Sequence, residues 1–271
     1  MKIRLLIPEC EGFNGYCSYE SKDIVGRIEL LNHLMNIGNG ISLVVTSNNY
    51  FQFNTKPKAD VKNFTKQILI PCLNKGIKNK IPVVFGFDFI LRKGTTKKKA
   101  KVIKYGSKLN PYGGINAVVT FLNVSNNSFV YGNHIWECWE GKGKCDPSNF
   151  EKQNNNRVFK FRNKTFGLLS CGDIARYCHG EGKRLPSVDI YLDLSHSSLR
   201  GWSSQNRVPT TLIRTWRKAK QVFVTQQVKD VSTYLYERKY PYIFPKMTRH
   251  TVQGLTVGGE RLGVYVDIDL K

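Results

Sequence analysis

The fold is decided by Phe166-Gly167-Leu168-Leu169-Ser170-Cys171-Gly172-Asp173-Ile174. The apolar run predicts a buried strand that ends on a thiol, and a helix is expected to begin at Asp173. A thiol at such a junction lies at the carboxyl edge of a sheet, where the helix dipole stabilises the thiolate. Cys171 therefore suits a nucleophile, although a buried, unreactive cysteine fits the same pattern.

Apolar runs and helical patterns alternate along the N-terminal third of the chain. Positions 24, 28, 31 and 35 are apolar, which is the spacing of an amphipathic helix, and the turn Gly38-Asn39-Gly40 follows them. This alternation is typical of α/β proteins. The predicted strands and helices, in the order βαβαβ, cover 1–9, Ile24–Met35, Ile41–Thr46, Val61–Leu73 and Ile81–Phe87.

Strands then follow one another without helices, which predicts antiparallel pairing. Turns at Asn126-Asn127 and Arg162-Asn163-Lys164 separate them, and the second turn leads into the strand before Cys171. The strands expected here are Phe89–Leu91, Ile115–Phe121, Ser128–Tyr131, Val158–Phe161 and Thr165–Ser170. Beyond Cys171 we expect helices over Asp173–Cys178 and Thr210–Lys220, and strands over Val188–Leu194, Gln221–Thr225, Gly254–Val257 and Gly263–Asp269.

The composition is that of a folded globular protein. The chain has 271 residues, of which 41% are hydrophobic and 12% aromatic. No apolar run approaches the roughly 20 residues of a membrane span, and the N-terminal apolar stretch is too short for a signal peptide. Seven cysteines, an odd number, favour a reducing compartment over a disulfide framework, so a cytoplasmic protein is expected. Their spacing matches no common zinc pattern, and neither a metal nor a cofactor is predicted.

The net charge is +22, because 42 lysines and arginines face 20 acidic residues. Such an excess favours polyanions, with nucleic acid ahead of an anionic membrane, and it also suits an acidic protein partner. The charge is densest in a basic insertion at residues 92–114, and further basic stretches are Lys160–Arg162 and Arg214–Lys220. A solvated loop explains the same run. The candidate polyanion-binding residues are Arg92, Lys93, Lys97, Lys98, Lys99 and Lys101.

The order and spacing of four segments resemble the nitrilase, or carbon-nitrogen hydrolase, superfamily. The likeness covers nearly the whole chain, and the final run Asp267-Ile268-Asp269-Leu270 matches an acidic-apolar run of that family. The segments are 41–50, 81–87 with 114–121, 166–174 with 188–198, and 254–270.

The resemblance implies an α/β fold with a four-layer α-β-β-α sandwich, formed by residues 1–271 as a single domain. It also implies a homo-oligomer and a small amide- or nitrile-like substrate. In that family a Cys attacks the substrate carbon, a Glu moves protons and a Lys stabilises the tetrahedral intermediate. Cys171 falls at the nucleophile position.

The other two family positions hold asparagines. The family's Glu ends the second strand in a Pro-Glu dipeptide, where this chain has Ser47 and Asn48. The family's Lys falls at Asn133, and Glu140 matches the family's second Glu, with Glu137 nearly as plausible. The resemblance thus predicts a carbon-nitrogen hydrolase-like protein whose triad is degenerate.

Two functions remain open. In the first, the protein is a cysteine-dependent hydrolase of non-peptide C–N bonds with impaired hydrolysis, in which His134 activates Cys171. The further candidates for this role are Glu137, Glu140 and His196. In the second, it is a catalytically inactive member of the same fold, a pseudoenzyme that binds nucleic acid or another polyanion through its basic surface.

Overall fold

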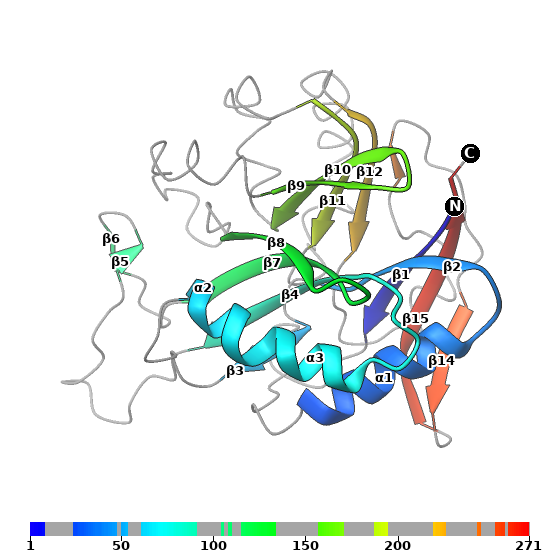
Figure 1. The fold of residues 1–271 in the computed structure, drawn as a ribbon, viewed down its shortest axis with the longest axis horizontal. Helices are drawn as coiled ribbons and strands as arrows, with labels where there is room; N and C mark the ends of the chain where they lie inside the picture. The colour runs from blue at the N-terminus through cyan, green and yellow to red at the C-terminus, as the bar shows by residue number, and fades with distance from the viewer. Residues whose placement is uncertain are drawn as a thin grey trace.

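The structure is a computed structural model of the whole chain. It describes residues 1–8, 24–47, 50–53, 61–90, 104–105, 108–109, 115–133, 157–170, 187–194, 219–225, 243–244, 253–257 and 260–270. Two packed sheets and a layer of helices make up this part of the chain (Figure 1). The helix expected over Asp173–Cys178 lies outside the described residues.

The larger sheet has eight strands in the order β14-β15-β1-β2-β4-β7-β8, with β3 paired to β4. Strands β1, β2 and β4 are mutually parallel, whereas β15 runs antiparallel to its neighbours. Strand β7 also runs antiparallel to its neighbours, as the helix-free middle of the sequence predicted. The strand bounds are β1 Lys2–Pro8, β2 Ile41–Val45, β3 Phe51–Phe53, β4 Val83–Ile90, β7 Ile115–Asn123, β8 Ser128–Asn133, β14 Gln253–Val257 and β15 Glu260–Asp269.

The second sheet has five strands in the order β13-β12-β11-β10-β9. Its central strands β10, β11 and β12 are parallel, and β9 forms a hairpin with β10. The bounds are β9 Val158–Phe161, β10 Lys164–Ser170, β11 Val188–Leu194, β12 Ala219–Thr225 and β13 Ile243–Phe244. A separate small pair, β5 Lys104–Tyr105 with β6 Lys108–Leu109, lies in the basic insertion.

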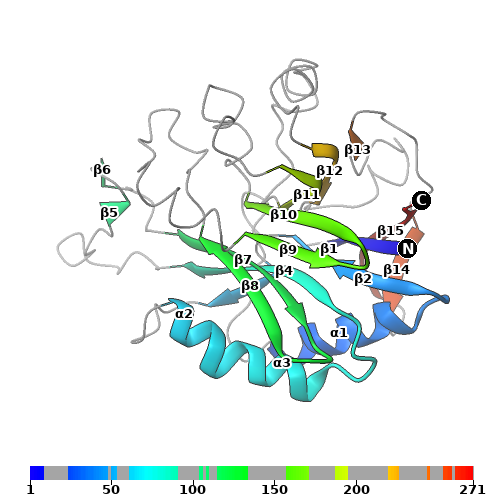
Figure 2. The same cartoon turned by 45° about the horizontal axis from the view of Figure 1, so that its top comes forward.

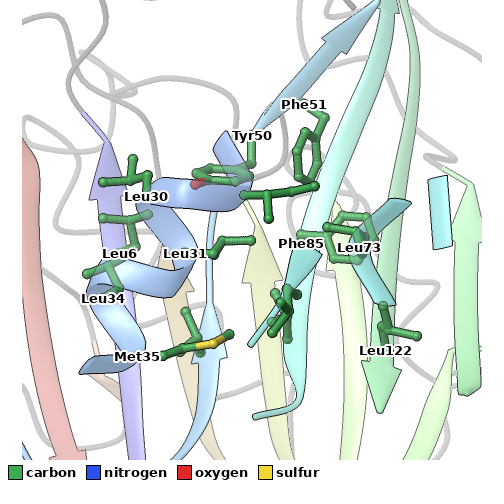
Figure 3. Close-up of a cluster of buried hydrophobic side chains, with 14 of the residues drawn as sticks. Leu6, Leu30, Leu31, Leu34, Met35, Tyr50, Phe51, Leu73, Phe85 and Leu122 are labelled. Carbon is green, nitrogen blue, oxygen red and sulfur yellow. The ribbon is translucent and has the colours of Figure 1, made fainter. Parts of the chain in front are cut away.

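Helices cover one face of the larger sheet (Figures 1 and 2). They are α1 Ile24–Asn36 and a continuous helical segment made of α2 Val61–Phe64, η3 Thr65–Leu69 and α3 Ile70–Gly76. Leucines of α1 pack on aromatic residues of the sheet and its loops, as the close-up in Figure 3 shows. Residues of this first core cluster include Leu6, Leu30, Leu31, Leu34, Tyr50, Phe51, Leu73, Phe85 and Leu122.

The opposite face of the larger sheet packs against the second sheet. Side chains alternate along β4, so that Val83 and Phe85 face the helices while Val84 faces the second sheet. Between the sheets, the ring of Phe121 stacks on Phe159 at 3.8 Å, and Phe159 stacks on Phe166 at 5.1 Å. This aromatic stack fixes β7 of one sheet against the β9–β10 hairpin of the other.

One buried arginine ties the larger sheet to the end of α1. Arg4 on β1 donates two hydrogen bonds of 2.7 Å to the carboxylate of Asp267 on β15. Its Nη1 donates to the carbonyls of Leu34 and Ile37, the second at 2.6 Å. The guanidinium also lies 4.4 Å from the centre of the Tyr265 ring. Arg4 therefore satisfies helix-end carbonyls that would otherwise lack donors.

The outer face of the second sheet is buried as well. Tyr191 on β11 and Leu169 on β10 point away from the inter-sheet core and are at most 1% exposed. The Tyr191 ring lies over Gly167, where an added Cβ would come within 2.2 Å of it. Burial raises the pKa of the Tyr191 hydroxyl, and the nearby Arg157 offsets part of this rise.

The predicted strands agree with the structure at most positions, and the exceptions are local. Residues Ala219 and Lys220 belong to β12, so the helix expected over Thr210–Lys220 is wrong at its end; the rest of that range is outside the described residues. Phe89 and Ile90 extend β4 instead of starting a strand of their own. The short strand β3 was not predicted, because three residues are too few to show a period.

Candidate active site

The two sheets present their carboxyl edges at the same end of the molecule. Arg162, in the turn before β10, donates a 2.7 Å hydrogen bond from Nη1 to Oγ of Ser42 near the start of β2. The beginnings of β10 and β2 therefore lie together, and the Phe121–Phe159–Phe166 stack aligns the strands beyond this point. Since β4 and β8 run parallel to β2, all of these strands end on the same side.

The end of β2 is irregular. Val44 and Val45 pair with Val83 and Val84 of β4, and the amide of Thr46 donates to the carbonyl of Val84 at 2.8 Å. A regular parallel ladder would next join the amide of Gly86 to the carbonyl of Thr46. That amide instead donates to the carbonyl of Ser47, at 3.2 Å. This one-residue slip is a bulge, a feature that often re-aims side chains beside functional sites.

Ser47 is the last described residue after β2 and precedes Asn48, which the resemblance predicts to stand at the family's Glu position. Its side chain is fully buried, and its Oγ has no hydrogen-bond partner among the residues that the structure describes. Its carbonyl also accepts a hydrogen bond from Oγ1 of Thr46, at 3.2 Å. Asn48 follows directly and lies outside the described residues. From the sequence alone, Ser47 is only a departure from the family's Pro, and no sequence signal sets it apart from the neighbouring polar residues.

The end of β8 lies at the same level of the sheet. Gly132 pairs with Val119, which pairs with Gly86, the residue whose amide binds the Ser47 carbonyl. Asn133 is the last residue of β8, one step further toward the carboxyl edge. The ends of β2 and β8 therefore lie at one edge of the sheet, with β4 and β7 between them.

Strand β10, which directly precedes the predicted nucleophile Cys171, ends at this edge too. Strand β10 ends at Ser170, directly before Cys171, and the parallel β11 ends at Leu194, before His196. Cys171, His134, Glu137, Glu140 and His196 lie outside the described residues, as do the predicted polyanion-binding residues of the basic insertion. The structure thus places the strands that lead to the candidate site, and the side chains of the site stay predictions.

Two general properties concern only the described part of the chain. No group of three or more His, Cys, Asp or Glu residues is arranged there to hold a metal ion. None of the helices described is long and apolar enough to cross a membrane.

No protein-family model matches the sequence, and no characterised protein is detectably similar to it in sequence.

The structure matches that of an amidase from Nesterenkonia sp., with a TM-score of 0.52 and 9% sequence identity over 99% of this chain and 90% of the amidase chain. A double mutant of the amidase from Nesterenkonia sp. AN1, in complex with acrylamide, gives a TM-score of 0.50 at 10% identity, with the same coverage. Another mutant, described as an amidase from the nitrilase superfamily, matches with a TM-score of 0.49 at 10% identity over 100% of this chain and 92% of that chain. At these identities the likeness shows the mixed α/β fold.

Proposed function

We propose that the protein is a carbon-nitrogen hydrolase-like member of the nitrilase superfamily with Cys171 at the nucleophile position. The observation that carries the proposal is the convergence of β2, β8 and β10 on one carboxyl edge. The fold shared with an amidase supports it. The buried outer face of the second sheet fits the fourth layer of an α-β-β-α sandwich, with residues 1–271 as one domain.

The chemistry follows from the residue types. The Cys171 thiolate attacks the amide carbon, the C–N bond breaks, and the departing amine takes a proton; water then hydrolyses the thioester. Asn48 cannot transfer protons, because an amide side chain has no titratable group. Asn133 can donate a hydrogen bond to the oxyanion but brings no charge.

Hydrolysis is therefore impaired. A positioned general base contributes about 10²–10⁴-fold, and one oxyanion donor about 10²–10³-fold. Their product, roughly 10⁴–10⁷-fold, is an upper bound because such losses rarely multiply cleanly.

Thiol reactivity tests the nucleophile position. Iodoacetamide labelling followed by mass spectrometry compares Cys171 with Cys72, which is exposed on α3 and serves as an internal reference for an ordinary thiol. We expect Cys171 to react faster than Cys72, and the Cys171→Ala variant to lose only that label. Equal or slower labelling of Cys171 in the native protein contradicts the proposal.

Restoring the family residues tests the interpretation of the two asparagines. The double variant Asn48→Glu/Asn133→Lys should gain amidase activity on small amides such as butyramide or acrylamide, measured by ammonia release. The matched control, Asn39→Glu/Gln67→Lys, makes the same change in charge at two exposed positions and should gain nothing. If the double variant folds but gains no amidase activity, positions 48 and 133 do not correspond to the family's Glu and Lys.

A further inference from the structure

Three connections between elements lie at the edge opposite the candidate active site. The α3–β4 connection, the β7–β8 turn and the β9–β10 turn all lie where β2, β4, β8 and β10 begin. A surface at this edge is therefore separate from the carboxyl edge and has no part in the proposed hydrolysis.

Two of these connections, 74–80 and 160–164, are basic, and the β7–β8 turn between them is polar and uncharged. Segments 74–80, 123–128 and 160–164 contain no Asp or Glu. All but one of their cationic side chains are exposed, and Lys164 is half-buried. Together they form the amino-edge surface, whose cations are Lys75, Lys78, Lys80, Lys160, Arg162 and Lys164.

Asparagine side chains hold the helix-side half of this surface in place. Asn32 of α1 donates to the carbonyl of Gly76 at 2.8 Å and accepts from the amide of Lys78 at 2.9 Å. The ammonium group of Lys80 donates to the carbonyl of Asn74 at 2.7 Å. Asn74 in turn donates to Asn127 of the β7–β8 turn. The connection and the turn are thus one hydrogen-bonded unit.

The two halves of the surface meet at β2. Arg162 binds Ser42, and the amide of Val44 donates to the carbonyl of Pro82 at 3.1 Å, two residues after Lys80. Neighbouring strands are about 4.8 Å apart, so the cations of both halves lie within reach of one extended ligand.

Among the described residues, three acidic side chains lie nearest to this surface, and none belongs to its three segments. Asp189 accepts a hydrogen bond from the amide of Thr165, so part of its charge is already engaged. Glu29 is about two turns back along α1 from its end at Asn36. Asp269 is paired with Lys2, on the far side of β2 from β4.

We propose that the amino-edge surface binds the phosphate backbone of nucleic acid without sequence preference. Lys, Arg, Asn and Ser side chains are those that contact phosphates and sugars in such complexes, and all four occur here. A membrane surface is less suited, because interfacial binding needs bulky apolar side chains to insert. The exposed large hydrophobic residues of the described chain, Val25 and Ile68, lie on the helical layer in the first turn of α1 and in η3.

Fluorescence anisotropy with a labelled 20-base-pair DNA duplex tests the proposal on the full chain across a salt series. The patch variant Lys78→Gln/Lys160→Gln removes one cation from each half. The control variant Lys66→Gln/Gln67→Glu lowers the net charge by the same two units at exposed positions of η3, outside the surface. If each patch lysine contacts a phosphate, the patch variant should bind roughly 50-fold more weakly near 0.1 M salt, and the slope of log K against log salt should flatten by about 1.8. The control variant should keep the native slope.

Three outcomes overturn the proposal: no duplex binding at low salt, an affinity that is insensitive to salt, or equal weakening in the patch and control variants. The last would show that diffuse net charge, and not this surface, attracts the duplex. Vesicles of phosphatidylcholine with phosphatidylserine serve as a second probe. Binding to the vesicles without binding to the duplex assigns the surface to membranes and rejects nucleic acid.

Discussion

Arg4 on β1 and Ser47 after β2 are two buried polar side chains on neighbouring strands, at most 1% exposed. Arg4 bonds to a carboxylate, two carbonyls and the face of a ring. The Ser47 hydroxyl has no partner within the described residues. Burial of a polar group costs free energy unless hydrogen bonds compensate. The difference separates a residue that holds the fold together from one at the edge where the candidate site begins.

The largest effect is expected when Asp267 loses its charge. Asp267→Asn leaves the Arg4 guanidinium buried without an anion, which typically costs about 3–5 kcal/mol. Urea denaturation measures the change in the free energy of unfolding. A loss below about 1 kcal/mol would show that the helix-end carbonyls alone satisfy Arg4.

Removal of Arg4 should cost less. In Arg4→Met the Leu34 and Ile37 carbonyls lose their donor, but Asp267, which is 22% exposed, regains contact with water. We expect the free energy of unfolding of Arg4→Met to fall by about 2–3 kcal/mol. In the double variant Arg4→Met/Asp267→Asn, the fall should be smaller than the sum of the two single falls. Strict additivity in the double-mutant cycle would contradict a direct pair.

A smaller effect is expected at the contact between the sheets. Ser42→Ala removes the acceptor of the Arg162 hydrogen bond, and because Arg162 is exposed, water replaces the lost partner. The loss should be about 0.5–1 kcal/mol by urea denaturation. Thr165→Val serves as a control, since Thr165 bonds Asp189 through its backbone amide on the same hairpin.

The smallest effect on stability is expected at Ser47. Ser47→Ala removes a buried hydroxyl without a described partner, so the free energy of unfolding should stay within about 0.5 kcal/mol of the native value or rise. Thermal unfolding of both proteins provides the measurement. A loss above about 1 kcal/mol would place Ser47 with Arg4 among the structural groups.

The sequence predicted the β strands well because alternating or continuous apolar runs report burial directly. The strand ending at Ser170, the hairpin around Arg162-Asn163 and the terminal strand pair all agree with the structure. It failed where tertiary contacts decide: Ala219 and Lys220 join β12 because they continue a strand beside β11, although their local pattern suits a helix.

The sequence predicted where along the chain the candidate site lies, but not the hydrogen bonds around it. Apolar runs located the ends of β2, β8 and β10 and so the edge that they share. The slip at Ser47 could not be predicted, because it depends on which carbonyl the Gly86 amide selects across the sheet. The Arg4–Asp267 pair was also missed: 263 positions separate the two residues, and no local pattern reports such a contact.

The pairing of β1 with β15 also sets an order of events during synthesis. Strand β1 leaves the ribosome long before its antiparallel neighbour, which spans Glu260–Asp269. Until those residues emerge, one side of β1 offers unpaired backbone groups and Arg4 has no counter-ion. Such open strand edges favour association with other chains. We expect the nascent protein to depend on protection by chaperones until its larger sheet closes.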